Sequence, residues 1–198
     1  MQGSVISVKT SDTNRTLVTV ELALGNEKKK YTVSEGTYRE IGCPLSGDIL
    51  DEDELELLEH EFQRREAMKK ALRILAYADN NKKNLYRKLV KAGYSTDNAT
   101  YTVNECVRLG YVDEERQLER LITLACNRDL NGPSKIYARL LAKGYRAADI
   151  TEAIARLTRL GEINFTESKK ILLSRKDPAT REEKQKILYK YGYKNEND

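Results

Sequence analysis

The feature that most constrains this chain is a helical segment that recurs along it. Residues 132–145, GPSKIYARLLAKGY, start with Pro133 at the first helical position and close at Gly144. Proline lacks only an N–H that a helix start leaves unbonded, and glycine reaches the left-handed conformation of a helix C-cap without a Cβ penalty. The same pattern recurs in NNKKNLYRKLVKAGY (80–94) and in EEKQKILYKYGY (182–193). Such recurrence predicts a repeat protein.

A second landmark keeps the same spacing. Gly93 and Gly144 lie 51 residues apart, and so do Gly110 and Gly161 in the related motifs RLGYVD and RLGEIN. The third unit follows at a spacing of 48, at Gly192, and the chain ends before a further helix could follow. A fixed period at independent landmarks indicates tandem units of the same structure.

Apolar stripes at helical spacing place three short helices in each full unit. They are predicted at 67–78, 82–92 and 97–109, at 114–128, 133–143 and 148–160, and at 165–174 and 178–191. Three stripes can enclose a small core, and neighbouring units can then stack. The predicted fold class is therefore mainly α, with tandem three-helix repeats stacked into an elongated curved body.

The N-terminal part has a different period. Apolar and polar residues alternate over 18–24, which is typical of a half-buried strand. A turn at 25–28 allows 30–33 to return antiparallel, and 5–8 offers a third strand. A sheet this small needs a cover, for which residues 35–41 and the start of the next helix are the candidates. The sequence predicts a small β-rich head.

The next helix opens with a capping box, in which Asp51 accepts from first-turn amides and Glu54 reaches back. No Gly or Pro interrupts residues 51–78, so one long helix is possible, and a break at 63–66 is the alternative. The predicted domains are a head, a helical connection, two repeats and a partial third repeat. Their bounds are 1–50, 51–66, 67–112, 113–162 and 163–198.

Charge is distributed unevenly along the chain. Residues 1–66 hold 8 Lys and Arg against 14 Asp and Glu, whereas residues 67–198 hold 27 against 17. A basic helical body of this kind suggests a polyanionic partner, usually nucleic acid. Three scattered cysteines indicate reduced thiols, with Cys106 and Cys126 expected in the core. No leader and no apolar run of membrane-spanning length is present, so we expect a cytoplasmic monomer without a membrane partner.

Motifs for chemistry are absent from the sequence. His60, the one histidine, has no Cys or Asp at ligand spacing, and there is no glycine-rich phosphate-binding loop. The acidic run at 51–54 lacks the glycine and the distal glutamate of a calcium loop, so capping explains it better. We therefore expect no catalytic residues, no metal, no cofactor and no enzyme activity.

Basic residues with tyrosines among them remain on the repeated helices. Stacked units would align them along one extended surface suited to a phosphate backbone or a filament. The alternative is that these charges only solvate helix faces and that Tyr86, Tyr137 and Tyr189 are core residues. The predicted binding residues are Lys82, Lys83, Arg87, Lys88, Lys91, Arg128, Lys135, Arg139, Lys143, Arg146, Lys184, Lys186 and Lys190.

These motifs, taken in order, resemble the RecX family of recombination regulators. The resemblance rests on ALRILAYADNNKKNLYRKLVKAGY (71–94), RLGYVDEERQLERLI (108–122) and DLNGPSKIYARLLAKGY (129–145), and 163–193 is similar to a third repeat. At the start of the second helix of the first unit, this chain has Asn80-Asn81 where the family often has Ser or Thr. Asn is also a good helix cap. The last unit departs from the family pattern because its final helix is missing.

The resemblance implies a protein that binds RecA, above all the RecA filament on single-stranded DNA, and restrains its recombinase, ATPase and coprotease activities. The family has no catalytic motif to carry over. A stand-alone nucleic-acid-binding protein without sequence preference is the second hypothesis, since the same basic residues would serve it. An enzyme acting on nucleic acid is disfavoured, because no carboxylate–histidine or metal cluster is present.

Overall fold

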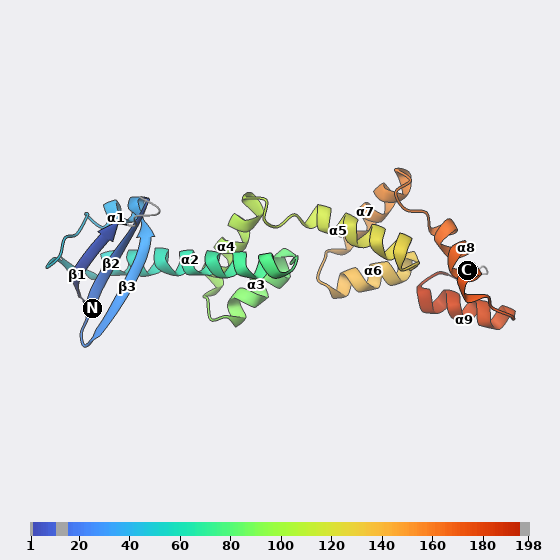
Figure 1. Cartoon of the computed structure of the whole chain (residues 1–198), viewed down its shortest axis with the longest axis horizontal. Coiled ribbons are helices and arrows are strands. Elements are labelled where there is room, and N and C mark those ends of the chain that lie inside the picture. Colours follow the sequence, from blue (N-terminus) through green and yellow to red (C-terminus); the bar gives the residue numbers. More distant parts are fainter. Residues whose placement is uncertain (1, 11–15, 195–198) are drawn as a thin grey trace. The chain divides into compact units, whose positions relative to one another are not determined.

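The structure of the chain, a computed structural model, describes residues 2–10 and 16–194 (Figure 1). It divides into two units. The first contains Met1–Ala78 and Leu85–Leu109, and the second contains Asp79–Asn84 and Gly110–Asp198. Helix α3 therefore begins in the second unit and continues in the first.

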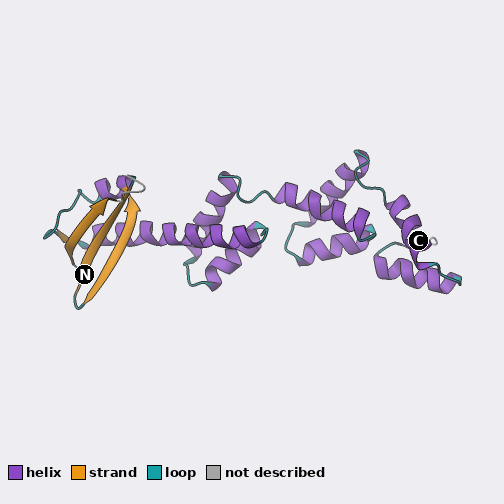
Figure 2. Ribbon diagram, viewed as in Figure 1, coloured by secondary structure: helices purple, strands orange, loops and turns teal. Residues whose placement is uncertain are grey.

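The first unit is a four-stranded antiparallel sheet with helices. Its elements are β1 (Gly3–Thr10), β2 (Leu17–Leu24), β3 (Glu27–Ser34), α1 (Glu35–Glu40), β4 (Ile49–Leu50), α2 (Glu52–Tyr77), most of α3 (Lys82–Lys91) and α4 (Thr96–Arg108). The strand order is β3-β2-β1-β4. Figure 2 shows the three long strands beside one another. The three strands expected from the alternating pattern are confirmed, whereas the two-residue β4 was not predicted.

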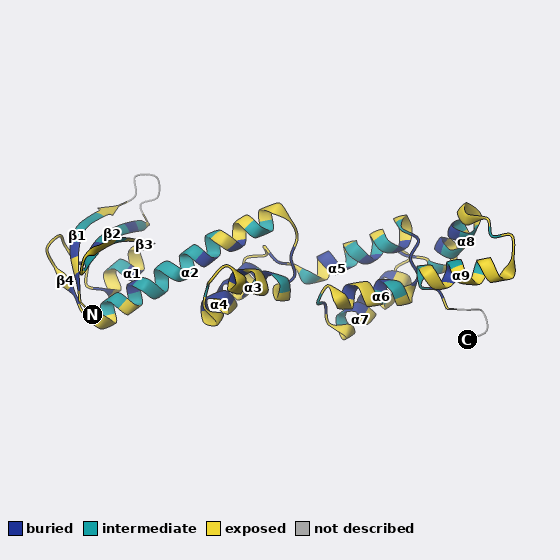
Figure 3. Ribbon diagram, turned by 90° about the horizontal axis from the view of Figure 1, so that it is seen from below, coloured by how far each residue is buried: buried dark blue, intermediate teal, exposed yellow. Residues whose placement is uncertain are grey.

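The sheet buries one face against helices. Val18, Val20 and Leu22 alternate inward along β2 and are at most 3% exposed. Figure 3 shows the ribbon of the sheet coloured by burial. Ile41, at the end of α1, and Leu58, on α2, belong to the same cluster. The cover predicted for the sheet is thus confirmed.

Helix α2 runs without a break from Glu52 to Tyr77, so the alternative of a break at 63–66 is wrong. The capping box is present, because Glu54 N–H donates to Asp51 and Asp51 N–H donates to Glu54, both at 2.9 Å. The predicted limit at residue 66 lies inside this helix. Ala67 and Ala71 are fully buried further along it, in the part of the unit where α2 packs against α4.

The second unit is helical. Its elements are the start of α3, then α5 (Glu114–Thr123), the π-helical turn η1 (Leu124–Arg128), α6 (Pro133–Ala142), α7 (Ala147–Arg159), α8 (Phe165–Lys176) and α9 (Arg181–Tyr191). Most helix limits agree with the predicted ones within one or two residues, and α9 starts three residues later. The π-turn, closed by the Asp129 N–H on the Leu124 carbonyl, was not predicted. The stacking of three-helix repeats and the domain bounds stay predictions, and residues 195–198 of the third repeat lie outside the described residues.

Two apolar clusters hold the second unit. The larger joins α5, η1, α6 and α7 through residues such as Ile122, Ile136 and Ile150. The smaller joins α8 and α9 around Leu172 and Leu188. Cys126 is fully buried in the larger cluster, and Cys106 is fully buried in the first unit, as expected. Among the described residues, no helix is long and apolar enough to cross a membrane.

Tyr193 gives the second unit a pH dependence. Its hydroxyl donates to the Leu130 carbonyl at 3.2 Å, and burial raises its pKa to about 12. In the unfolded chain this tyrosine loses its proton near pH 10, so the unfolded state gains stability above that pH while the folded state stays protonated. We expect the free energy of unfolding to fall by about 2 kcal/mol between pH 10 and pH 12 from this group.

Denaturant unfolding at pH 8 and at pH 11 measures this effect. Tyr193→Phe, which has no proton to lose, should show a smaller decrease than the unchanged chain over the same interval. An equal decrease in both proteins would contradict the assignment to Tyr193.

Candidate functional site

The helices that carry most of the predicted binding residues end in the same way. Gly93, Gly144 and Gly192 follow α3, α6 and α9 with φ of 96°, 95° and 81°. In each case the next residue, a tyrosine, donates its N–H to the carbonyl five residues back, at 2.9–3.3 Å. This is the left-handed helix end that the sequence motif predicts. The three helix ends therefore share a local geometry.

Eleven of the thirteen predicted basic residues are exposed, and Lys135 and Lys184 are half-buried. Arg87, Lys88 and Lys91 belong to the first unit, and the others belong to the second. Several side chains have no ion-pair or hydrogen-bond partner among the described residues. These are Lys83, Lys91, Arg139, Lys143, Lys186 and Lys190.

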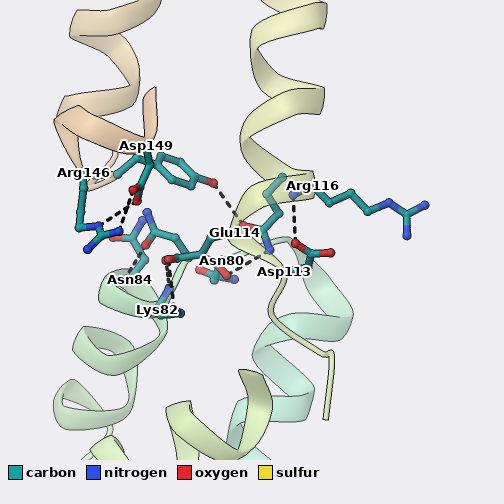
Figure 4. Close-up of polar contacts among 11 residues, drawn as sticks. Asn80, Lys82, Asn84, Asp113, Glu114, Arg116, Arg146 and Asp149 are labelled. Atoms are coloured by element: carbon teal, nitrogen blue, oxygen red, sulfur yellow. Dashed lines mark hydrogen bonds and ion pairs between the residues drawn. The ribbon is translucent and has the colours of Figure 1, made fainter. Parts of the chain in front are cut away.

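One group of predicted residues is brought together where α3 begins and α6 ends (Figure 4). The side-chain amides of Asn81 and Asn84 both donate to the Lys143 carbonyl, at 2.9 and 3.0 Å. Asn81 also caps α3, because its side-chain oxygen accepts from the Asn84 N–H at 2.9 Å. The two amides bond the Lys143 carbonyl at the end of α6, a group that a helix end otherwise leaves open. They fix the backbone that carries Lys82, Lys83 and Lys143.

Acidic residues partly neutralise this group. Lys82 Nζ lies 3.6 Å from Glu114, whose carboxylate also accepts the Lys82 N–H at 2.7 Å. Arg146 donates two hydrogen bonds to Asp149, at 2.7 and 2.9 Å, and these bonds hold the pKa of Asp149 below its ordinary value. Lys83 and Lys143 keep unpaired charges, so they are the members best placed to contact an external anion.

A shallow polar pocket lies beside this group. Tyr145 donates to Gln117 at 3.2 Å, and Arg120 pairs with Asp79. Burial raises the pKa of Tyr145, so its hydroxyl stays protonated and acts as a donor at neutral pH. The pocket is lined by Asp79, Asn81, Asn84, Gln117, Arg120, Leu121, Lys143 and Tyr145. Its polar groups bond one another, and they form no arrangement of nucleophile and base.

A second group lies where α6 begins and α9 ends. The Gly132 N–H donates to the Tyr191 carbonyl at 2.7 Å, and Lys135 Nζ donates to the Lys190 carbonyl at 3.1 Å. The Lys135 ammonium also lies 4.7 Å from the centre of the Tyr191 ring. This docking leaves the Lys190 side chain exposed at the end of α9.

Other predicted residues are not part of either group. Arg128 pairs with Asp129 at 2.9 Å, so its charge is partly neutralised. Among the tyrosines, Tyr137 packs against the larger cluster, which agrees with the alternative of a core residue. Tyr189 is 82% exposed, so it is not a core residue and the alternative does not apply to it.

The sequence motifs did not reveal two features. The donation by Asn84 to a helix end far along the chain has no local signal, since Asn84 lies in the first turn of α3. Tyr77, 94% exposed at the end of α2, appears in the sequence only as part of an apolar helix.

His60 lies on α2, with Nδ1 3.9 Å from a carboxylate oxygen of Glu61. Over residues 2–10 and 16–194, no three His, Cys, Asp or Glu side chains gather in a way that could hold a metal ion.

Comparison with known proteins gives a result at the level of the fold. No protein-family model and no curated protein sequence matches the chain. A crystal structure of the regulatory protein RecX matches with a TM-score of 0.70 and 19% identity, over 97% of this chain and 95% of that one. The crystal structure of RecX from Lactobacillus salivarius matches with a TM-score of 0.56 and 21% identity, over 67% of this chain and 89% of that one. The resemblance of the sequence motifs is thereby confirmed in three dimensions: the chain has the fold of RecX.

Proposed function

We propose that this protein is a RecX-type regulator that binds RecA, or the RecA filament on single-stranded DNA, and inhibits its recombinase, ATPase and coprotease activities. The observation that carries the proposal is a RecX fold over nearly the whole chain, together with the RecX-like motifs in their order. Such a regulator acts in DNA repair and the SOS response, in the cytoplasm. It works by occupying its partner and needs no catalytic residue.

The exposed cations suit this role. Lys83 and Lys143 carry unpaired charges beside a helix end that hydrogen bonds hold in place. Arg139 lies on α6, one turn before the C-cap residue Lys143, and its side chain is also unpaired within the described part of the chain. A filament that carries DNA presents rows of phosphates, and unpaired exposed cations are attracted to them. We propose that Arg139 and Lys143 contact this filament.

Reversing both charges tests that contact. Arg139→Glu with Lys143→Glu should weaken binding to RecA filaments at least about tenfold, since each reversal near anions costs about 1 kcal/mol in partly screened surroundings. Binding is measured by the anisotropy of fluorescently labelled single-stranded DNA coated with RecA. Helicity should be unchanged, because both side chains are exposed.

A matched control separates position from net charge. Arg159→Glu with Lys170→Glu makes the same change in charge at exposed cations outside the proposed set. This variant should bind filaments nearly as well as the unchanged chain. Equal weakening by both variants would show that only net charge matters and would remove Arg139 and Lys143 from the contact.

A second candidate function is direct binding of nucleic acid. The observation that favours it is Tyr189, 82% exposed, with Lys186 one turn before it and Lys190 after it. An exposed aromatic ring beside cations can stack on a base while the cations contact phosphates. If this function holds alone, binding to labelled single-stranded DNA decreases steeply with salt and is the same with and without RecA. Stronger binding to RecA-coated DNA favours the regulator.

A further inference from the structure

The N-terminal head, residues 1–50, carries two large apolar side chains that lie outside its buried core. Leu45 is 68% exposed and Ile49 is 64% exposed, whereas Ile41 and Leu50, on either side of them in the chain, are buried. Among the described residues before α2, Leu45 and Ile49 are the large apolar residues that remain exposed. Two such side chains four residues apart need a structural or functional explanation.

Hydrogen bonds hold both residues in place. The Leu45 N–H donates to the Asp48 carboxylate at 2.7 Å, and the Asp48 N–H donates back to the Leu45 carbonyl at 3.1 Å. Ser46 donates its hydroxyl to the Ile6 carbonyl at 2.7 Å, which ties the turn to β1. Leu45 and Ile49 therefore lie on a fixed surface, and no rearrangement is needed before they can bind.

Ile49 also lies on an open edge of the sheet. Strand β4 is the last in the order β3-β2-β1-β4, and Ile49 stands opposite Ser4 of β1. The Val5 N–H donates to the Asp48 carbonyl, so the alternation of antiparallel pairing directs the peptide groups of Ile49 away from β1. The opposite edge, β3, carries three consecutive lysines at 28–30, which discourage association, and β4 carries none.

The segment of the chain that carries these two side chains is acidic. Residues 42–56 contain six carboxylates and no Lys or Arg. Asp51 and Glu54 are engaged in the capping box of α2, whereas Asp53 and Glu56 are exposed. We call Leu45, Asp48, Ile49, Asp53 and Glu56 the head patch.

The chain itself offers a surface of complementary chemistry. On α9, Tyr189 is 82% exposed, and Lys186 and Lys190 flank it within one turn. Both ammonium groups lack an ion-pair partner in the part of the chain that the structure describes. We call these three residues the α9 face. It has an exposed apolar ring between positive charges, whereas the head patch has exposed aliphatic side chains beside negative charges.

We propose that the head patch of one copy docks on the α9 face of a second copy. The two surfaces are complementary in charge and in apolar content, which favours association and sets its orientation. Two head patches facing each other would repel, since all their charges are negative. The contact is therefore head to tail, and it leaves each copy with one free surface of each kind unless the assembly closes on itself. The proposed self-association differs from the expectation of a monomer, which stays untested, and it does not rest on binding to RecA.

Sedimentation velocity of the full chain tests the proposal. Measurements from about 5 to about 500 µM, in about 0.05 M and about 0.5 M salt, cover a weak association and its screening. We expect the average mass to rise with concentration at low salt and to rise less at high salt. A single monomeric species at every concentration would overturn the proposal. The partner expected for the head patch would then be a basic segment of another protein.

Three variants locate the contact. Leu45→Gln with Ile49→Thr should abolish the rise in mass, and Thr keeps the branched side chain that suits a strand. Leu160→Gln is the matched control, because Leu160 is also 64% exposed and lies outside both surfaces. It should associate like the unchanged chain. Association that survives the head-patch change, or that Leu160→Gln abolishes equally, would contradict the proposal.

A charge exchange gives the most specific result. Lys186→Glu with Lys190→Glu should stop self-association, and so should Asp53→Lys with Glu56→Lys. Mixing the two variants should restore heavier species, because the unchanged head patch of the first variant fits the unchanged α9 face of the second, and the two reversed surfaces are also complementary to each other. No heavier species in the mixture, with both variants folded by circular dichroism, would overturn the assignment of α9.

Discussion

Gly132→Ala is expected to lower the free energy of unfolding by about 3 kcal/mol, although it adds only one methyl group. The backbone at Gly132 is extended, with φ −79° and ψ 170°, a conformation that alanine adopts without strain. A Cβ there would lie 2.4 Å from the Gly192 carbonyl oxygen and 2.8 Å from the Tyr193 nitrogen. Because both atoms are backbone, no side-chain rotation relieves the overlap.

The expected loss in the free energy of unfolding comes from a weakened hydrogen bond as well as from the steric overlap. Moving the chain away to admit the methyl group would lengthen the bond from the Gly132 N–H to the Tyr191 carbonyl, now 2.7 Å. It would also shift Lys135 from the Lys190 carbonyl. Urea unfolding followed by circular dichroism measures the change in the free energy of unfolding.

Gly161→Ala is the control for this prediction. Gly161 has φ 74°, a left-handed backbone, but a Cβ at that position meets nothing within 4 Å. The substitution should therefore cost only about 1 kcal/mol, from backbone strain. If Gly132→Ala cost no more than Gly161→Ala, the close docking of α6 on the end of α9 would be contradicted.

Ile150→Ala is expected to lower the free energy of unfolding by about 3 to 4 kcal/mol, because it removes a fully buried side chain from the larger cluster of the second unit. The cost combines the lost transfer of apolar surface from water with the cavity that remains among neighbours such as Ile122, Ile136 and Leu157. Ile122 and Ile136 come from two other helices, α5 and α6, so the cavity cannot close by a local shift of α7 alone. Urea unfolding followed by circular dichroism measures this change in the free energy of unfolding.

The matched control is Leu160→Ala, on a residue of similar size that is 64% exposed. Its effect should stay within about 0.5 kcal/mol, as for most surface changes. A comparable loss in the two variants would mean that Ile150 does not lie in the core of the second unit.

Local signals in the sequence predicted the helices well. Proline at the start of α6 and glycine after α3, α6 and α9 determine where these helices begin or end, and each acts through its own backbone. The capping box at Asp51 and the absence of Gly and Pro allowed one long helix, and α2 is unbroken. The short-range period of β2 was enough to identify the buried face of the sheet.

Contacts between distant residues could not be predicted in the same way. The amide of Asn81 bonds the Lys143 carbonyl, 62 residues away, and nothing next to Asn81 specifies that partner. Strand β4 has two residues, too few to show a period. Ion pairs such as Arg146 with Asp149 and Arg128 with Asp129 lower the charge available at predicted binding residues. The sequence identified the cations, and the structure separates paired from unpaired ones.

We propose that the chain regulates RecA by occupying its filament, and the most direct test is a titration of RecA's ATPase. Hydrolysis of ATP by RecA on single-stranded DNA is followed while the purified full chain is added below and up to equimolar amounts. We predict that the rate falls progressively and that the fall begins at substoichiometric amounts, because one bound regulator affects a filament of many subunits. An unchanged rate at every ratio would contradict the account.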